Sequence, residues 1–269
     1  MPTVGEIVTY LDQLAARHLA EDWDNTGLLL GDRNRPALKV MTCLTATQAV
    51  VEEACDEQVN LLISHHPLPF RPLKIITAES HSSKKVWQLA SQGVSLYSPH
   101  TRWDSASGGI NQQWAEGLDL WNIEPLLPTE EPDPAGGTGR QGTFAQPLSL
   151  LEVCHKVKSF LDFVGLFTPL RVVGENEKLI ERVGIGCGGA DSFLGDAIKA
   201  KCDLFITGEA RFHNCLEAEE REIGFILTGH YASERFAYDR LAKQLSEKFA
   251  DCEVWSSRRE GNPWNLYSG

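Results

Sequence analysis

Short apolar segments alternate with helix-like segments along most of this 269-residue chain. Strands that alternate with helices of about ten residues predict βαβ units and largely parallel sheets. We therefore expect an α/β fold with mainly parallel sheets flanked by helices. The expected strands are 38–44, 59–63, 94–97, 170–173, 182–186, 204–207, 225–228 and 253–255, and the expected helices are 3–20, 46–57, 83–92, 111–116, 149–161, 192–200, 210–221 and 232–249.

One stretch, 125–142, interrupts this alternation with a cluster of prolines, glycines and charged residues. Such punctuation is typical of a loop that connects two folded parts. We interpret it as a crossover between a first lobe, 1–125, and a second lobe, 126–239.

The two lobes resemble each other at two places. Val59–His66 matches Cys202–Glu209 in character, position by position, and Gly93–His100 parallels Ile223–His230 in the same order. In each segment a buried strand ends in a serine or threonine, followed by a polar side chain. We interpret this similarity as an internal duplication, so the lobes should share a topology.

Charge and composition exclude several classes of protein. The chain has 37 acidic and 25 basic residues and a net charge of -12, which argues against a surface that binds duplex nucleic acid. Hydrophobic residues make up 42%, as in globular proteins. The apolar segments are too short for a bilayer span, and we expect no secretory signal. The seven cysteines form no C-x-x-C pair, so we expect reduced thiols and a cytoplasmic protein.

Histidines concentrate at the expected strand ends, where parallel α/β sheets gather their ligands. The other histidines, 18, 81 and 155, fall in expected amphipathic helices and are interpreted as surface residues. The histidines at or just after strand ends are His65, His66, His100, His213 and His230.

Five residues at these ends together suggest a metal site. His65 and His66 are adjacent after a strand, His230 and Glu234 share one face of a helix, and Asp104 follows another strand end. Taken singly, each has an ordinary alternative: a satisfied histidine, a surface pair or a helix cap. Taken together, three imidazoles and two carboxylates favour metal binding.

The donor set limits the metal and the reaction. Mixed nitrogen and oxygen ligands suit zinc, manganese, iron, cobalt or nickel, without a choice among them. Five protein ligands exceed what one catalytic zinc ion takes and could hold two divalent ions. Such a pair would make a nucleophile from water at neutral pH, so hydrolysis is the expected class of reaction.

The chain resembles the NIF-three-like family, which is named for an NGG-one-interacting factor and is also called GTP cyclohydrolase 1 type 2 homologues. The resemblance covers essentially the whole chain. It rests on Trp23–Leu28, Ile63–Leu68, Ser98–Thr101 with Asp104, Gly139–Gly142, Cys187–Ala190, Thr207–Glu209 with His213, and Gly229–Tyr231 with Glu234.

The resemblance implies two interlinked α/β lobes of similar topology, with residues 240–269 returning to the first lobe. It also implies a toroidal homohexamer whose metal sites face an inner cavity. One departure is that Arg102 and Trp103 precede Asp104, where small or amide residues are more usual. The implied ligands of a dinuclear metal centre are His65, His66, Asp104, His230 and Glu234, with Glu234 as the bridge.

Further roles follow from the same resemblance. His100 is expected to orient Asp104 or the substrate, and Glu209 with His213 to act as general acid or base. Asp24 and Asn25 are expected near the site. The alternative for Glu209 and His213 is a capping pair at a helix start.

Two other readings of the sequence remain open. The segment 184–189 satisfies G-x-G-x-x-G, the pattern of a dinucleotide site, although a tight turn explains it equally simply. Tryptophans could stack a base, but they more often pack in a core or interface. These tryptophans are Trp103, Trp114, Trp121 and Trp264.

Two hypotheses of function from different classes follow. The first is a metal-dependent hydrolase of a nucleotide or related cyclic amidine, as the GTP cyclohydrolase name implies. The second is a non-catalytic ring that binds or handles metal, or that interacts with proteins. An open coordination position would favour the first hypothesis, and partner binding without turnover would favour the second.

Overall fold

The chain forms two compact units in a computed structural model that describes residues 1–80, 83–129 and 136–265. The first unit comprises residues 1–102 and 238–269, and the second comprises 103–237. The sequence analysis placed the division at 125/126 and the return of the chain at 240. His81 and part of the expected crossover 125–142 lie outside the described residues.

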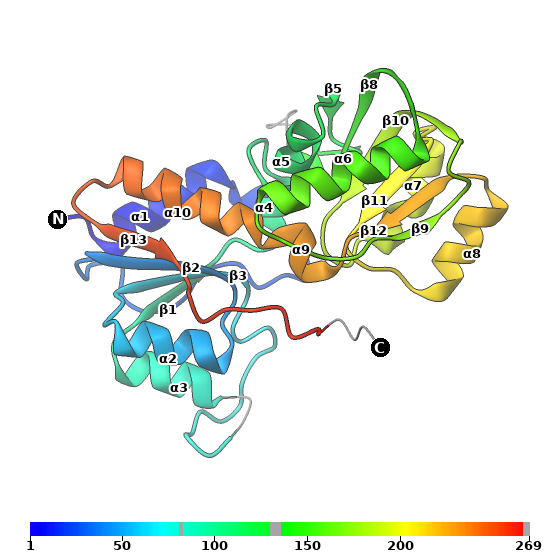
Figure 1. The fold of residues 1–269 in the computed structure, drawn as a ribbon. Coiled ribbons are helices and arrows are strands. Elements are labelled where there is room, and N and C mark those ends of the chain that lie inside the picture. The colour runs from blue at the N-terminus through cyan, green and yellow to red at the C-terminus, as the bar shows by residue number, and fades with distance from the viewer. Residues whose placement is uncertain (81–82, 130–135, 266–269) are drawn as a thin grey trace. The chain divides into compact units, whose positions relative to one another are not determined.

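The first unit contains a five-stranded sheet in the order β1-β4-β3-β2-β13 (Figure 1). All neighbours pair in parallel except the edge strand β1, which runs antiparallel to β4. The parallel strands confirm the predicted sheet, whereas β1 was not expected. The strands are β1 (Gly27–Leu30), β2 (Lys39–Thr45), β3 (Leu61–His66), β4 (Ser95–Ser98) and β13 (Glu253–Ser256).

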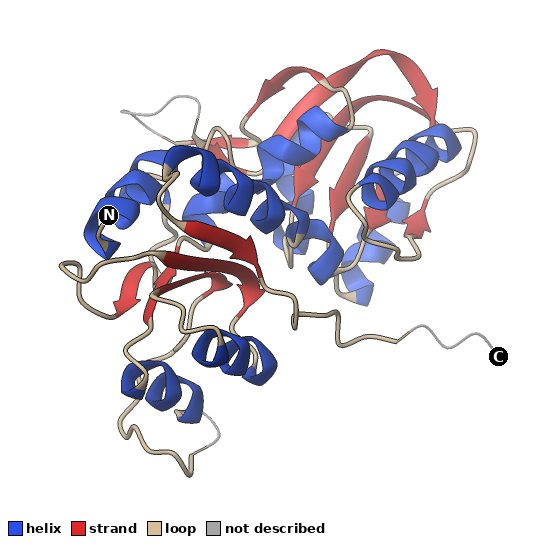
Figure 2. Cartoon of the chain, turned by 60° about the vertical axis from the view of Figure 1, so that its left-hand side comes forward, coloured by secondary structure: helices blue, strands red, loops and turns tan. Residues whose placement is uncertain are grey.

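Helices cover both faces of this sheet (Figures 1 and 2). Helices α2 and α3 pack on one face through a core that includes Met41 and Leu62, and α1 and α10 lie side by side on the other. The helix expected over 3–20 starts with a Thr3–Glu6 capping box but ends at Leu14. The elements are α1 (Val4–Leu14), α2 (Gln48–Asp56), α3 (Lys84–Ser91), α10 (Phe236–Lys248) and the 3-10 turn η1 (Arg17–Leu19).

The second unit contains a six-stranded sheet in the order β5-β8-β10-β11-β12-β9. Only β10, β11 and β12 are parallel to one another, and the outer pairings are antiparallel. This sheet is therefore mixed, because antiparallel strands flank the three parallel ones on both sides, β5 and β8 beside β10 and β9 beside β12. The strands are β5 (Trp121–Glu124), β8 (Arg140–Ser149), β9 (Arg171–Val173), β10 (Leu179–Gly186), β11 (Leu204–Thr207) and β12 (Gly224–Leu227), beside the hairpin β6 (Leu127–Pro128) and β7 (Gly137–Thr138).

Alternate residues of the central strand β11 face different helices. Phe205 stacks on Phe225 in the core under α7 and α8, whereas Leu204 lies toward Gly224 and Leu150 of α6. The helix expected over 232–249 is divided at Arg235 into α9 and α10. The remaining helices are α4 (Thr101–Ser105), α5 (Ile110–Gly117), α6 (Leu150–Phe163), α7 (Leu194–Lys199), α8 (Phe212–Glu220) and α9 (His230–Glu234), with the 3-10 turn η2 (Asp191–Phe193).

The two units repeat one topology. The order β2-α2-β3-α3-β4 in the first matches β10-α7-β11-α8-β12 in the second, with three parallel strands in each. This confirms the predicted α/β fold with two parts of similar topology. Within each unit the carboxyl ends of these strands meet at one edge of the sheet, where α/β proteins bind ligands. No helix in the described part of the chain is long and apolar enough to cross a membrane.

Candidate metal-binding clusters

Three histidines gather at the carboxyl edge of the first unit's sheet. His65 and His66 are the last two residues of β3, and His100 follows β4. Successive side chains of a strand point to opposite faces of the sheet, but here the strand ends, and the two rings approach each other beyond it. The ring centroids of His65 and His66 lie 5.0 Å apart, and that of His100 lies 5.1 Å from His65. One potential ligand atom from each lies within 4.8 Å of the others, so this cluster could hold a metal ion.

An oxygen atom orients each of these imidazoles through its Nδ1. The Nδ1 of His65 lies 2.9 Å from the hydroxyl of Tyr238, and the Nδ1 of His66 lies 2.7 Å from the hydroxyl of Thr45. A hydrogen bond at one ring nitrogen is the usual device that fixes a metal-binding histidine. The Nε2 atom is then the one that each ring presents to an ion.

The third imidazole is paired with a buried carboxylate. Asp24 Oδ1 lies 2.7 Å from His100 Nδ1, and Asp24 Oδ2 accepts a hydrogen bond of 2.5 Å from the Thr101 hydroxyl. Burial raises the pKa of Asp24, but the hydrogen bonds from His100 and Thr101 outweigh it and lower the pKa. Asp24 is therefore an anion at neutral pH. The backbone of His100 has a φ of +38°, an uncommon conformation for a residue with a side chain.

Two aromatic side chains border His100. The ring centroids of Trp23 and Phe70 lie 6.0 and 6.3 Å from that of His100. Trp23 was noted only as part of the motif Trp23–Leu28 and Phe70 not at all, whereas four other tryptophans were the candidates for stacking a base. Of those, Trp103 and Trp114 are buried, and Trp121 and Trp264 are exposed. Trp23 and Phe70 lie on two loops that are distant in sequence. The periodicity of apolar residues therefore does not reveal that they are close together.

The second unit carries its own imidazole–carboxylate cluster. His230 opens α9, with its Nδ1 2.8 Å from Glu209 Oε1 and its Nε2 3.2 Å from Glu234 Oε2. Burial lowers the pKa of His230, but hydrogen bonds and charges from Glu234 and Glu209 raise it to about 9 overall. A divalent ion that binds this ring must therefore displace a proton.

Asp104 lies in α4, where a buried thiol contacts its carboxylate. The Sγ of Cys187, just after β10, donates to Asp104 Oδ1 at 3.1 Å. Burial raises the pKa of Cys187 far above its usual value, and the charges of Asp104 and Glu234 add to this effect. The thiol is therefore neutral and a hydrogen-bond donor. Like the other cysteines, all of which lie in the described part of the chain, it forms no disulfide.

The unusual Arg102 and Trp103 that precede Asp104 are both buried. Arg102 donates from Nη2 to Asp12 Oδ1 at 2.7 Å and from Nε to the carbonyl of Ala15 at 2.9 Å. The guanidinium therefore serves the packing of α1 within the first unit.

The predicted acid–base residues differ in their surroundings. Glu209 contacts His230, whereas His213 is exposed on α8, and no hydrogen bond or ion pair in the described structure joins it to His230. The capping alternative is wrong for Glu209, because the N-cap of α8 is Arg211, without a side-chain bond. His100 was expected to orient Asp104 or the substrate; its carboxylate partner at Nδ1 is Asp24.

The G-x-G-x-x-G segment begins in β10, which ends at Gly186, and its last three residues lie in the turn that follows. Gly188, an x position of the pattern, has a φ of +63°, and a Cβ there would lie 2.2 Å from Glu234 Oε1, so the turn requires glycine there. Gly186, one of the motif's own glycines, is favoured by close packing, because a Cβ there would lie 2.6 Å from that of Ala190. These requirements of the turn and of the packing involve no dinucleotide.

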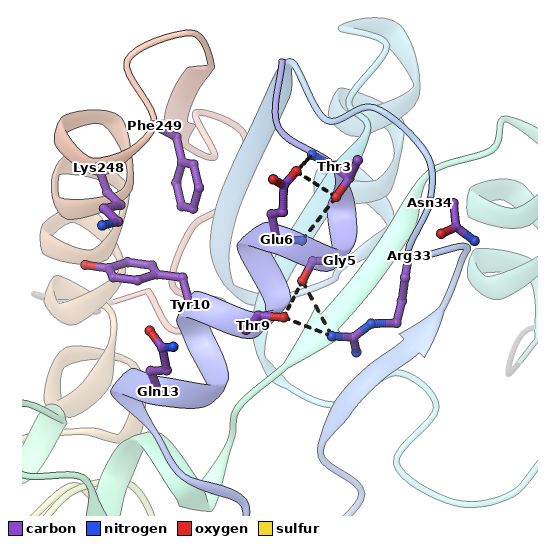
Figure 3. A pocket seen from close by; sticks show the side chains of 10 residues that line it. All are labelled: Thr3, Gly5, Glu6, Thr9, Tyr10, Gln13, Arg33, Asn34, Lys248 and Phe249. Atoms are coloured by element: carbon purple, nitrogen blue, oxygen red, sulfur yellow. Dashed lines mark hydrogen bonds between the residues drawn. The ribbon is translucent and has the colours of Figure 1, made fainter.

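A separate hollow of about 620 Å³ lies in the first unit, lined by the first turns of α1 with Arg33, Asn34, Lys248 and Phe249 (Figure 3). The side chains around it include hydrogen-bonded Thr3 and Glu6, which form the capping box of α1 (Figure 3). No predicted site residue lines this hollow. The histidine cluster therefore remains the candidate site of the first unit.

Comparison with known proteins identifies the relatives of this chain. The family model described as Duf34/NIF3 (NGG1p interacting factor 3) matches residues 2–263. The chain belongs to the DUF34/NIF3 family. This confirms the resemblance seen in the sequence.

Several named proteins are similar to nearly the whole chain. A "GTP cyclohydrolase 1 type 2 homolog" of Clostridium perfringens is 30% identical over 98% of this chain and 99% of its own length. "NIF3-like protein 1" of Drosophila melanogaster is 33% identical over 97% of this chain and 88% of its own. The Bacillus cereus protein related to NIF3 superposes with a TM-score of 0.88 at 21% identity, covering 99% of both chains, and so shows the shared fold.

Proposed function

We propose that this protein binds two divalent first-row metal ions and uses them to hydrolyse a nucleotide-like substrate. The observation that supports metal binding is the histidine cluster, in which His65, His66 and His100 are each oriented by an oxygen at Nδ1. Such anchored imidazoles fit a divalent ion with nitrogen and oxygen ligands. The proposed ligands remain His65, His66, Asp104, His230 and Glu234.

The proposed reaction depends on what two ions supply when bound. Two adjacent divalent ions lower the pKa of water and thereby provide a nucleophile at neutral pH. The name shared by several relatives, GTP cyclohydrolase 1 type 2 homolog, supports a nucleotide as the substrate class. Fold and family name alone do not specify a reaction, so the proposal rests on the clusters.

The chain's own residues supply proton transfer and orientation. Glu209 is 61% exposed and hydrogen-bonds to His230, so it can exchange protons with solvent while it holds that ring. We assign it the role of general acid or base. His100, held by Asp24, would position the substrate beside the first cluster. His213, exposed on α8, is a second candidate for proton transfer.

Elemental analysis of untagged protein purified without chelator tests the metal proposal. We expect about two first-row ions per chain in the wild type and fewer in His66→Ala and in His230→Ala. His18→Ala and His155→Ala are matched controls, because both histidines are exposed, as predicted, and should leave the count unchanged. No metal in the wild type, even after loading with zinc or manganese, would refute the proposal.

Incubation of the metal-loaded protein with GTP tests hydrolysis. We expect ring-opened or dephosphorylated products from the wild type and a loss of turnover in Glu209→Gln with its metal retained. Full metal content without any turnover of a nucleotide panel would instead support the non-catalytic metal-binding alternative.

A further inference from the structure

The aromatic pair Trp23 and Phe70 is notable for its exposure beside a cluster of imidazoles. Trp23 is 62% exposed and Phe70 is 51% exposed, although both are large apolar side chains. Their ring centroids lie 6.1 Å apart, and both approach the ring of His100 nearly edge to face, at interplanar angles of 80° and 89°. Exposed apolar side chains that gather at a candidate site commonly mark a binding surface.

The loops that carry these rings are fixed rather than loosely attached. Asn25 Nδ2 donates to the carbonyl of Pro69 at 2.8 Å, which ties the residues after Trp23 to the residue before Phe70. The backbone N–H of Asn25 donates to Asp24 Oδ1 at 2.7 Å, and the same oxygen accepts a hydrogen bond from His100. One hydrogen-bond network therefore fixes the positions of the aromatic pair and of the His100 imidazole relative to one another.

A role in packing alone does not account for this pair. Buried aromatics of the same chain, such as Trp114, lose almost all of their accessible surface, whereas Trp23 and Phe70 keep half or more. Water contact over that area costs free energy in the unliganded protein. A flat apolar ligand that covers the two rings would regain that free energy.

We propose that Trp23 and Phe70 form a stacking site for the planar heteroaromatic ring of the substrate, and place its reactive end beside the histidine cluster. The inference rests on the proposed function and specifies the part of a nucleotide that the protein recognises: the base rather than the phosphates. Every nucleobase has a π face, so such a site binds a planar ring without requiring a particular pattern of hydrogen-bond donors and acceptors. Phosphate would be recognised elsewhere, because neither Trp23 nor Phe70 carries a positive charge.

Calorimetric titration of the metal-loaded full chain with two probes tests the proposal. The probes are GTP, which has a ring, and inorganic tripolyphosphate, which has none. In Trp23→Ala and in Phe70→Ala we expect GTP to bind roughly 5- to 150-fold more weakly and tripolyphosphate to bind as in the wild type. Trp23→Phe keeps a π face and should retain most of the affinity for GTP. Trp264→Ala is a matched control, because Trp264 is 81% exposed and outside the aromatic pair.

Several results would overturn the stacking site. One is GTP binding by Trp23→Ala at wild-type strength, and another is an equal loss of GTP and tripolyphosphate. A third is wild-type protein that binds GTP no more tightly than tripolyphosphate. Metal content, measured on the same samples, separates the two proposals. Protein that takes up no metal even after loading with zinc or manganese, yet binds GTP in a Trp23-dependent manner, would refute the metal function and keep the stacking site. Loss of metal in Trp23→Ala would show that the indole only supports the cluster.

Discussion

At the scale of the residue, the orientation of His66 depends on a carboxylate far along the chain. Glu260 accepts hydrogen bonds from the amides of Leu44 and Thr45, at 3.0 and 2.7 Å. Thr45 in turn holds Nδ1 of His66 through its hydroxyl. The partner of the imidazole is therefore itself fixed, which lowers the entropy that a metal would have to remove on binding.

Removal of the Thr45 hydroxyl should weaken metal binding without disturbing the sheet. We expect Thr45→Val to bind zinc about 10- to 100-fold more weakly than the wild type, as for other partners that orient a metal-binding histidine. Thr45→Ser keeps the hydroxyl and should restore most of the affinity. Competition with a chelator of known affinity measures both variants. Equal affinities in the wild type and Thr45→Val would show that this hydrogen bond does not orient His66 for metal.

The sequence indicated the imidazoles and carboxylates but not what orients them. Adjacent histidines at a strand end are a local pattern, and Glu234 four residues after His230 is another. The residue that fixes His65 is Tyr238, 173 positions away. Only the tertiary fold brings such pairs together, so no spacing rule could have found Tyr238 or the Trp23–Phe70 pair.

At the scale of the element, the segment after β13 is held by one buried glutamate of α2. Glu53 accepts hydrogen bonds from the Ser257 hydroxyl at 2.5 Å and from the amides of Arg258 and Arg259 at 3.0 Å. Burial raises the pKa of Glu53, but these hydrogen bonds outweigh it and lower the pKa below its ordinary value of 4.5. The charged form is thus favoured in the folded protein.

Glu53→Gln should destabilise the protein in a pH-dependent manner. At pH 7 we expect a loss of about 1.5–3 kcal/mol in the free energy of unfolding, the typical contribution of hydrogen bonds to a charged group. A lowered pKa stabilises the fold above about pH 4.5, and that stabilisation disappears as the pH falls through the folded pKa. The difference between wild type and variant should therefore shrink in acid.

Urea unfolding at pH 7 and at pH 3.5 measures this difference. Glu52→Gln is the matched control: Glu52 neighbours Glu53 on α2 but is exposed, so its substitution should change stability by less than about 0.5 kcal/mol. A Glu53→Gln effect that is equal at both pH values would contradict the assigned role of the charge.

The strands of the parallel repeats and the edge strands β9 and β13 were predicted, whereas β1, β5 and β8 were not. The segment 204–207 was predicted with its observed bounds, because four consecutive apolar or β-branched residues mark a strand buried on both faces. The edge elements β1 and β5 are short, and β8 places Arg140 inward, where its guanidinium donates to the carbonyls of Gly137 and Ala106. Because this charged residue occupies a buried position, the sequence of β8 lacks the alternation of apolar and polar residues that would otherwise predict a strand.

At the scale of the whole molecule, the chain has two units that share a β-α-β-α-β core, each with histidines or carboxylates at the carboxyl edge of its sheet. The predicted duplication matched the segment that contains β3 with the one that contains β11, and the segment that contains β4 with the one that contains β12. These strands occupy equivalent places in the two repeats. The outer strands could not be predicted from the repeat, because they differ between the units. The return of residues 240–269 to the first lobe was expected from the family resemblance alone, because it depends on packing that no local pattern in the sequence reveals.

We propose the homohexamer as the assembled form, by analogy with the family resemblance. Phe163 and Phe167 are 84% and 77% exposed at the end of α6 and beyond, as expected of side chains that an assembly covers. Light scattering should therefore give a mass about six times the 29.8 kDa of one chain. A single species of 29.8 kDa across the micromolar range would refute the assembly.

The first unit is discontinuous in sequence, and this has a consequence for its synthesis. Residues 1–102 emerge from the ribosome before the second unit, but β13, Tyr238 and Glu260 emerge after it. The second unit, a single continuous segment, can fold first although the chain starts elsewhere. The ring of His65 therefore gains its partner Tyr238 only after the second unit has been synthesised, and Thr45, the partner of His66, likewise gains the carboxylate of Glu260 only then. The proposed metal site of the first unit is thus complete only after the second unit has been made.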